Sequence, residues 1–375
     1  MIVLRVIVFL LGAALATWTV LTAITTVVLP RGSRSVINSV VFGSSRVVFG
    51  FVAKRRPTYE QEDRVLALHA PFGLIGIVGT WLILVLVGFM FMFWALEPGI
   101  GWSGAFAESG SSITTLGFVA ADATAERALA FIEAGVGLLL LTLLITYLPT
   151  IYSAFARRET KVTLLEVRAG SPPSAIEFLL RYHRIGWLET LDEEWRQWET
   201  WFADIEESHT SYPSLVFFRS PDPDRSWVTA AGAILDAAAL DASAIPSTER
   251  AAPGVCIRAG YIALRRIADF FGIAYDPDPA PDDPISITRG EFDEAIGRLE
   301  AGGVDLVDDR DQAWGDFVGW RVNYDTVLLA LAELVHAPYA PWTSDRSTPD
   351  HTRPKIAAVW PGLRSRRATR NPSRH

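Results

Sequence analysis

Long apolar segments alternate with polar ones over the first 155 residues of the chain. Residues 1–29 are apolar apart from Arg5, and two further apolar runs cover residues 71–96 and 128–148. Each run is about as long as the ~20 residues that a membrane-spanning helix needs. Beyond residue 159 the hydropathy falls to that of a globular domain. The pattern therefore predicts a membrane half followed by a half that is exposed to water.

The segment of residues 30–66 follows the first apolar run and is basic up to Arg56. Its stretch from 36 to 53 is apolar but interrupted by polar and small residues, among them Asn38 and Gly43. Cytoplasmic loops of membrane proteins are enriched in lysine and arginine. We therefore interpret the segment as cytoplasmic, with an interfacial helix on anionic lipid; a re-entrant or spanning hairpin is the alternative. The basic residues are Arg31, Arg34, Arg46, Lys54, Arg55 and Arg56.

The charges of the loops give the chain an orientation. Residues 97–126 contain acids and neither lysine nor arginine, whereas Arg157 and Arg158 follow the third apolar run. The positive-inside rule then places the N-terminus outside and the C-terminus in the cytoplasm. We expect a multi-pass protein of the plasma membrane with three spans. For residues 1–29, a cleaved signal peptide is the alternative to a retained helix.

A mostly α-helical soluble domain is predicted over residues 159–343. Six segments show apolar positions at the 3.6-residue spacing of helices, and residues 215–218 suggest one short strand. Residues 227–244 are interpreted as a core helix rather than another span. Residues 344–375 are rich in Arg, Pro and Ser, and we expect a disordered basic tail. The six segments are 174–191, 192–207, 227–244, 255–271, 289–301 and 309–335.

Composition narrows the function of this domain mainly by exclusion. The formal net charge is -8, with most acids after residue 159, which argues against nucleic-acid binding. Cys256 is the single cysteine, so no intrachain disulfide can form. The sequence contains neither a glycine-rich nucleotide motif nor a His-Glu-x-x-His or Cys-x-x-Cys metal motif. We expect no catalytic residue, metal site or cofactor, and the ligand of the domain is left open.

Between the second and third apolar runs lies a short segment that is dense in hydroxyl groups. Residues 102–113 are long enough for about three helical turns, and a loop of Thr-Thr-Leu-Gly-Phe follows at residues 114–118. An apolar run, a short re-entrant segment and a second apolar run are the arrangement of a pore loop. Irregular backbone at membrane depth is tolerated only where protein buries it or water fills the space beside it.

With these residues, the stretch 71–155 resembles the pore module of tetrameric potassium channels. In that family, backbone carbonyls of four loops replace the hydration shell of the ion. The resemblance implies an outer helix, a pore helix, a filter loop and an inner helix within residues 67–158, with the pore loop at 102–119. It also implies an ion-selectivity filter formed by Thr114, Thr115, Leu116, Gly117 and Phe118.

The resemblance assigns roles to single residues. Thr115 aligns with the threonine of the innermost ion site, and Gly117 supplies the positive φ that successive pore-facing carbonyls require. Ser109 matches a serine of the family's pore helix. Glu133 is expected to support the filter from behind, with interfacial placement as the alternative. Gly135 and Gly137 form the candidate gating hinge of the inner helix, with close helix packing as the alternative.

Departures from the family pattern concern the outer mouth of the filter. Val119 stands where the family has a second glycine, and a β-branched residue disfavours positive φ. Ala120 replaces the acid that usually follows, and the next acid is Asp122. Ala107 and Glu108 occupy positions where aromatic residues are common. We therefore expect cation conduction with weakened selectivity for potassium.

The expected fold class is an all-α membrane protein: a pore module with an extra N-terminal transmembrane helix and a mostly α-helical soluble domain. The functional hypothesis is a homotetrameric, potassium-channel-like cation channel rather than an enzyme. One loop cannot enclose an ion, so each chain would contribute one filter loop for K⁺ or another monovalent cation. Membrane lipid is the other expected partner. The alternative is a non-conducting, membrane-anchored sensor or scaffold that keeps the pore fold.

Overall fold

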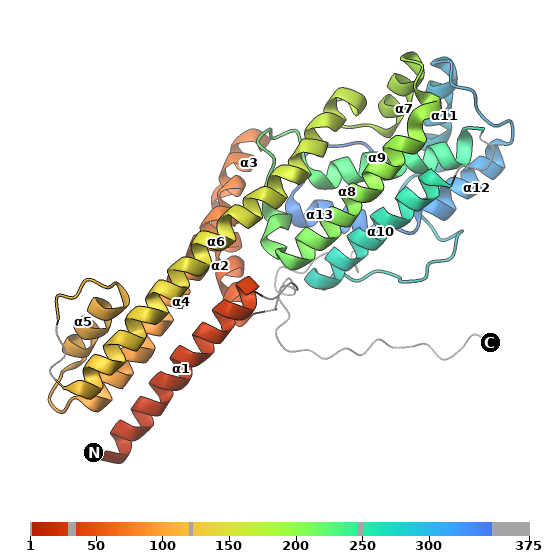
Figure 1. The fold of residues 1–375 in the computed structure, drawn as a ribbon. Coiled ribbons are helices and arrows are strands. Elements are labelled where there is room, and N and C mark those ends of the chain that lie inside the picture. Colours follow the sequence, from red (N-terminus) through yellow and green to blue (C-terminus); the bar gives the residue numbers. More distant parts are fainter. Residues whose placement is uncertain (1, 29–34, 120–122, 247–250, 347–375) are drawn as a thin grey trace, which may run out of the picture.

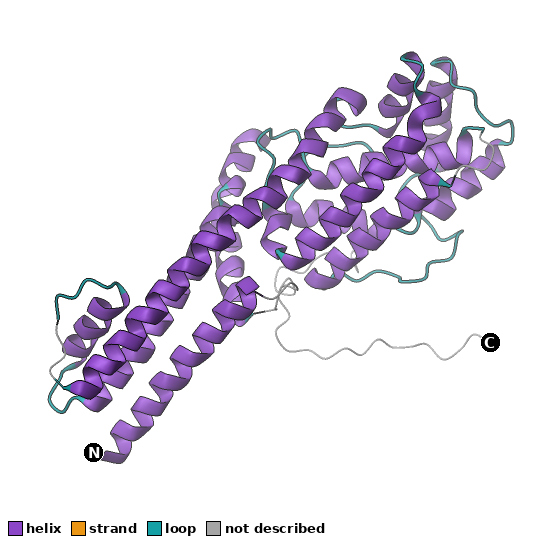
Figure 2. Cartoon of the chain, viewed as in Figure 1, coloured by secondary structure: helices purple, strands orange, loops and turns teal. Residues whose placement is uncertain are grey.

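The computed structural model describes residues 2–28, 35–119, 123–246 and 251–346. Within these ranges every regular element is a helix and none is a strand, as Figure 2 shows. The all-helical prediction is therefore confirmed for the described chain. Most of the predicted tail lies outside the described residues, from 347 onward, and so do Ala120 and Asp122 of the predicted outer mouth.

The first half of the chain forms an elongated bundle (Figure 1). α5 lies at one end of this bundle, close to the end at which α1 begins, and the second half of the chain lies at the other end. α4 and α6 run side by side between the two ends. The helices are α1 Ile2–Val28, α2 Val36–Ala53, α3 Tyr59–Ala67, α4 His69–Leu96, α5 Trp102–Ile113 and α6 Thr124–Ala169.

Four helical segments of the described chain are long and apolar enough to cross a membrane, namely Ile2–Val28, Val36–Ala53, Tyr59–Leu96 and Thr124–Ala169. This composition indicates a membrane protein. The sequence predicted three spans, and α2 is the additional candidate.

The position of α2 distinguishes it from the other three segments. Phe42 of α2 lies against Gly73, and Phe49 lies 5.7 Å from Phe72 between ring centroids. Both contacts are with the first turns of α4, so α2 packs beside one end of α4. That end faces the second half of the chain (Figure 1). A helix in this position fits the predicted interfacial segment.

Small residues bring α1 and α4 close together. A Cβ on Gly88 of α4 would lie 2.8 Å from the carbonyl oxygen of Gly12 and 3.1 Å from Cβ of Ala16. Nearer the start of α1, the Arg5 guanidinium lies 5.5 Å from the ring centroid of Trp94. In hydrocarbon no hydrophobic effect drives helices together, so close packing of this kind provides the association energy.

α6 continues for 46 residues, about 70 Å at 1.5 Å per residue. Pro149 lies inside the continuous helix and does not end it. Packing on both sides of the proline, by Tyr147 before it and Ile151 after it, keeps the helix intact although one N–H is missing. The predicted boundary between pore module and soluble domain at residue 158 therefore falls within a single helix.

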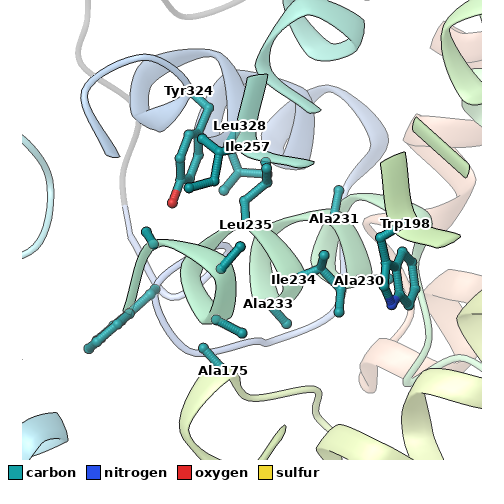
Figure 3. Close-up of a cluster of buried hydrophobic side chains, with 14 of the residues drawn as sticks. Ala175, Trp198, Ala230, Ala231, Ala233, Ile234, Leu235, Ile257, Tyr324 and Leu328 are labelled. Carbon is teal, nitrogen blue, oxygen red and sulfur yellow. The ribbon is translucent and has the colours of Figure 1, made fainter. Parts of the chain in front are cut away.

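The second half of the chain folds as a helical domain with its own core, referred to here as the C-terminal helical domain. α9 lies at its centre, where all but one of its residues are buried, and Figure 3 shows its apolar side chains among those of neighbouring helices. This confirms the predicted core helix. The elements are α7 Ala175–Arg184, η1 Leu188–Thr190, α8 Leu191–Ser211, η2 Pro213–Phe217, α9 Trp227–Ala244, α10 Ala252–Phe271, α11 Arg289–Ala301, α12 Arg310–Arg321 and α13 Asp325–Val335.

The predicted strand at residues 215–218 is wrong. These residues lie in and just after the 3₁₀ helix η2. The carbonyl groups of Leu215 and Phe218 accept hydrogen bonds from the side chain of Arg158, at 2.8 and 2.7 Å. A side chain of α6 thus contributes to the hydrogen bonding of this segment, together with the turn itself and the Trp227 ring N–H, whereas a strand would need a neighbouring backbone.

Two further boundaries differ from those predicted. The segment 309–335 is two helices, because the Asn323 side chain donates to the Gly319 carbonyl at 2.9 Å and stabilises a turn after α12. The predicted tail begins too early, since Arg346 donates to Glu291 Oε1 and to the Ser286 carbonyl, both at 2.6 Å. These contacts fix the chain through Arg346.

The contact of α1 with α4 predicts unequal effects of two alanine substitutions in α4. Gly88→Ala should destabilise the protein by roughly 1–3 kcal/mol, because the new methyl group meets backbone of α1. Gly79→Ala is the matched control, since a Cβ there has no atom within 4 Å. Thermal unfolding in detergent measures both. Equal stability of the two variants would contradict the packing described.

Candidate functional site

The candidate site is the loop after α5, at the end of the bundle farthest from the C-terminal helical domain (Figure 1). α5 packs against both α4 and α6. On the α4 side, the ring of Trp102 stacks on Trp94 with centroids 4.8 Å apart. On the α6 side, Gly137 lies so close to the carbonyl oxygen of Ile113 that a Cβ would not fit. The loop therefore starts from a helix that is fixed on two sides.

The backbone of the loop changes sign of φ from residue to residue. Thr114 has φ -86°, Thr115 has φ 56° and Gly117 has φ 68°, whereas Leu116 between them is not among the described residues with positive φ. Positive φ is unusual for a non-glycine residue and costs about 1–2 kcal/mol. The predicted positive φ of Gly117 is present, and Thr115 adopts positive φ as well.

Ser111 holds this irregular backbone in place. Its carbonyl oxygen accepts from the N–H groups of Leu116 at 3.0 Å and of Gly117 at 3.4 Å. Its hydroxyl oxygen accepts from the N–H of Val119 at 3.1 Å. Ser111 itself is buried. Three donors of the loop therefore end on one residue of α5, which the sequence analysis did not single out; the run of serines before the threonines was the only signal.

The loop residues from Thr114 to Val119 are all exposed on the single chain. The side chains of Leu116 and Phe118 are 70% and 65% exposed. Large apolar side chains on an irregular loop are unfavourable in water, and exposed loop backbone is unfavourable in lipid. This surface is suited to contact with further protein.

Ser109 of α5 and Glu133 of α6, which the sequence analysis considered separately, are hydrogen-bonded to each other. The Ser109 hydroxyl donates to Glu133 Oε1 at 2.6 Å and lies 2.9 Å from the carbonyl oxygen of Leu86. Both residues are fully buried. The pair connects α5, α4 and α6, so Glu133 is placed in the protein interior rather than at an interface with water. Glu133 Oε2 has no hydrogen-bond partner within the described chain.

The two glycines of the candidate hinge differ in surroundings. Gly137 is buried against Ile113 at the end of α5, which is the close-packing alternative. Gly135 is exposed, and a Cβ there would meet nothing within 4 Å. α6 passes through both positions as one helix. A hinge role stays a prediction, and Gly135 is the position with space for a change in shape.

At its other end α6 is anchored by a buried arginine. Arg158 is 1% exposed; besides the carbonyls of Leu215 and Phe218, its guanidinium contacts Glu159 Oε1 at 2.8 Å and His209 Nε2 at 3.2 Å. The sequence predicted a basic pair at the inner membrane surface, but only Arg157 is exposed. Arg158 joins α6 to the C-terminal helical domain.

Removal of the Ser109 hydroxyl should destabilise the protein. Ser109→Ala takes a donor from buried Glu133, which costs about 1–3 kcal/mol for an unsatisfied buried group. Ser112→Ala is the matched control, because its hydroxyl only donates to the carbonyl of Glu108 one turn earlier in the same helix. Thermal unfolding in detergent compares them. If Ser112→Ala lowered the stability as much as Ser109→Ala, the supporting role of Ser109 would be contradicted.

The Arg158 cluster predicts that acid weakens the C-terminal helical domain. Burial, and then the Arg158 charge, lower the pKa of His209 well below 6.5. The unfolded chain therefore binds the proton more readily, so stability is complete above about pH 6.5 and falls as the pH decreases below that value. Between about pH 6.5 and 5 the loss is at most about 2 kcal/mol.

His209→Gln should make unfolding less dependent on pH over this interval, and His183→Gln, which changes a partly exposed histidine, should not. Urea unfolding at the two pH values gives both slopes. Parent and His209→Gln curves of equal slope would show that His209 is not the responsible group.

Comparison with known proteins leaves the site to be judged from its own geometry. No family model, no curated protein and no solved structure matches the chain.

Proposed function

We propose that this chain is one subunit of a tetrameric, potassium-channel-like cation channel. The observation that carries the proposal is the alternating sign of φ at Thr114, Thr115 and Gly117, in an exposed loop that follows a short helix. Alternating φ turns successive carbonyl groups of a non-helical segment toward the same side. A row of carbonyl oxygens can replace the hydration shell of a monovalent cation.

The exposed apolar side chains of the single chain favour assembly of several chains into a closed ring. One loop offers oxygens to one side of an ion only, and four copies around an axis would surround it. The exposed side chains of Leu116 and Phe118 would then pack against neighbouring subunits instead of lipid or water. Exposed apolar residues on α6, such as Phe131 and Ile145 at 75% and 62%, provide a surface for neighbouring helices or lipid chains.

Passive conduction follows from the chemistry of such a ring. The C-terminal end of α5 carries the partial negative charge of the helix dipole, which favours a cation near the loop. No group is chemically changed, so the direction of flux depends only on the electrochemical gradient of the ion. Val119 in place of a second glycine gives one fewer position suited to positive φ, and we infer weakened preference for K⁺ over Na⁺.

The C-terminal helical domain would assemble or gate the pore through α6. The close packing of Gly137 against α5 and the hydrogen bonds of Arg158 lie in opposite halves of one continuous helix. A rotation of the domain would therefore move the helix that supports the loop. We infer a plasma-membrane protein with its N-terminus and loop outside and this domain in the cytoplasm, as the loop charges indicate.

Cation flux into liposomes tests the proposal. The purified full chain should pass K⁺, and less readily Na⁺, when each is supplied as a gradient. Gly117→Ala should reduce the flux strongly, because alanine at φ 68° is strained by about 1–2 kcal/mol per subunit. Gly110→Ala is the matched control: a Cβ there has no atom within 4 Å and the position is helical.

Loss of flux in Gly117→Ala with normal flux in Gly110→Ala would support the filter assignment. Equal flux in parent and Gly117→Ala would overturn it. The mass of the assembly in detergent gives an independent readout, since a monomer or dimer is incompatible with a fourfold pore. A stable tetramer without flux would favour the non-conducting sensor or scaffold.

A further inference from the structure

A cavity of about 490 Å³ lies between α2, α3 and the end of α13. It is outside the pore loop and the residues that support it. Three cationic side chains line it, Arg46, Lys54 and Arg219, together with the acids Glu62 and Glu333. The volume is within the range of small-molecule sites. The cavity therefore has charged residues in its lining and is large enough to hold a charged ligand.

Arg46 lines this cavity and has a donor that no described residue accepts. Its guanidinium lies 5.5 Å from the ring centroid of Phe217, and Nη2 donates to the Leu334 carbonyl at 2.9 Å. These contacts hold the planar group in one orientation. Nη1 is buried and has no hydrogen-bond partner among the described residues. A buried charged donor without an acceptor is unfavourable, and a phosphate oxygen is an acceptor suited to guanidinium.

The other charges determine which ligand fits. Arg219 is already occupied by Asp63, Tyr59 and the carbonyl groups of Val335 and His336. Lys54 is exposed at the end of α2 and has no ion pair within the described chain. Arg46 and Lys54 are therefore the cations left for a ligand. Because Glu62 and Glu333 offset part of this charge, the cavity is suited to a singly charged phosphodiester rather than a multiply charged phosphate.

An apolar strip on α2 continues from the cavity. Val36, Val40, Val47 and Phe51 fall on one helical face and are 59–63% exposed. Val47 and Phe51 also line the cavity. A ligand held at Arg46 can therefore lay an apolar chain along α2. This continuity favours a phospholipid over a free phosphate ion.

We propose that this cavity binds the phosphodiester headgroup of a phospholipid, with Arg46 as the main contact, Lys54 as the second, and an acyl chain along α2. The bound lipid would join α2 to the C-terminal helical domain at the membrane surface. The basic residues Lys54, Arg55 and Arg56 at the end of α2 are consistent with a location at the inner leaflet. The site goes beyond the proposed conduction and does not depend on it.

Lipid binding by the delipidated full chain in detergent tests the proposal. Native mass spectrometry with phosphatidylglycerol should give one preferred lipid per chain. Arg46→Gln should weaken this binding about tenfold, as expected for a lost charged hydrogen bond. Lys54→Gln should weaken it less, and because Lys54 is exposed this variant keeps the proposal testable even where Arg46→Gln fails to fold. Arg56→Gln is the matched control: it removes the same charge outside the cavity lining.

Two further probes separate the sources of the ligand chemistry. Diacylglycerol with the same acyl chains lacks the phosphate and should not compete for the site, and glycerol 3-phosphate lacks the chains and should compete only weakly. Competition by glycerol 3-phosphate at the concentration of the lipid would overturn the lipid assignment. Equal weakening in Arg46→Gln and Arg56→Gln would show general attraction to basic residues and would also overturn the site.

Discussion

The arrangement of the candidate pore depends on one requirement, that the N–H groups of an irregular loop must be satisfied where water is scarce. Ser111 meets this requirement by accepting from Leu116 and Gly117 with its carbonyl and from Val119 with its hydroxyl. The loop can then leave helical geometry directly after α5 without a neighbouring strand. Its own carbonyl groups are not used in these bonds and are available for another partner, which a permeant cation would provide.

α6 connects the loop to the C-terminal helical domain through buried contacts with each of them. Near the loop, Glu133 of α6 accepts a hydrogen bond from Ser109, and Gly137 of α6 packs against the end of α5. In the other half of the helix, Arg158 donates to the carbonyl groups of Leu215 in η2 and of Phe218 just after it. Both contacts are buried and geometrically specific, so neither end of the helix can rotate freely. This physical connection is how the C-terminal helical domain would influence the loop.

The cavity beside α2 raises the same question of hydrogen-bond partners for a buried polar group. Arg46 is held by an aromatic ring and one carbonyl, and its Nη1 has no hydrogen-bond partner among the described residues. In the loop and in Arg158, protein groups complete the polar contacts. At Arg46 the proposed phospholipid would complete them, and the exposed apolar strip of α2 is the observation that favours a lipid.

The sequence by itself determined the helical class, the long apolar helices and the position of the loop. Length, apolar periodicity and glycine at position 117 are local properties, because a helix or a positive φ depends mainly on adjacent residues. The tertiary structure decided the roles of Ser111 and Arg158, the continuity of α6 through Pro149, and the 3₁₀ turn at η2. Each of these depends on a hydrogen-bond or packing partner that the fold supplies. For Arg158 and the residues at η2 the partners are 57 and 60 positions apart in the chain, and the hydropathy pattern does not identify them.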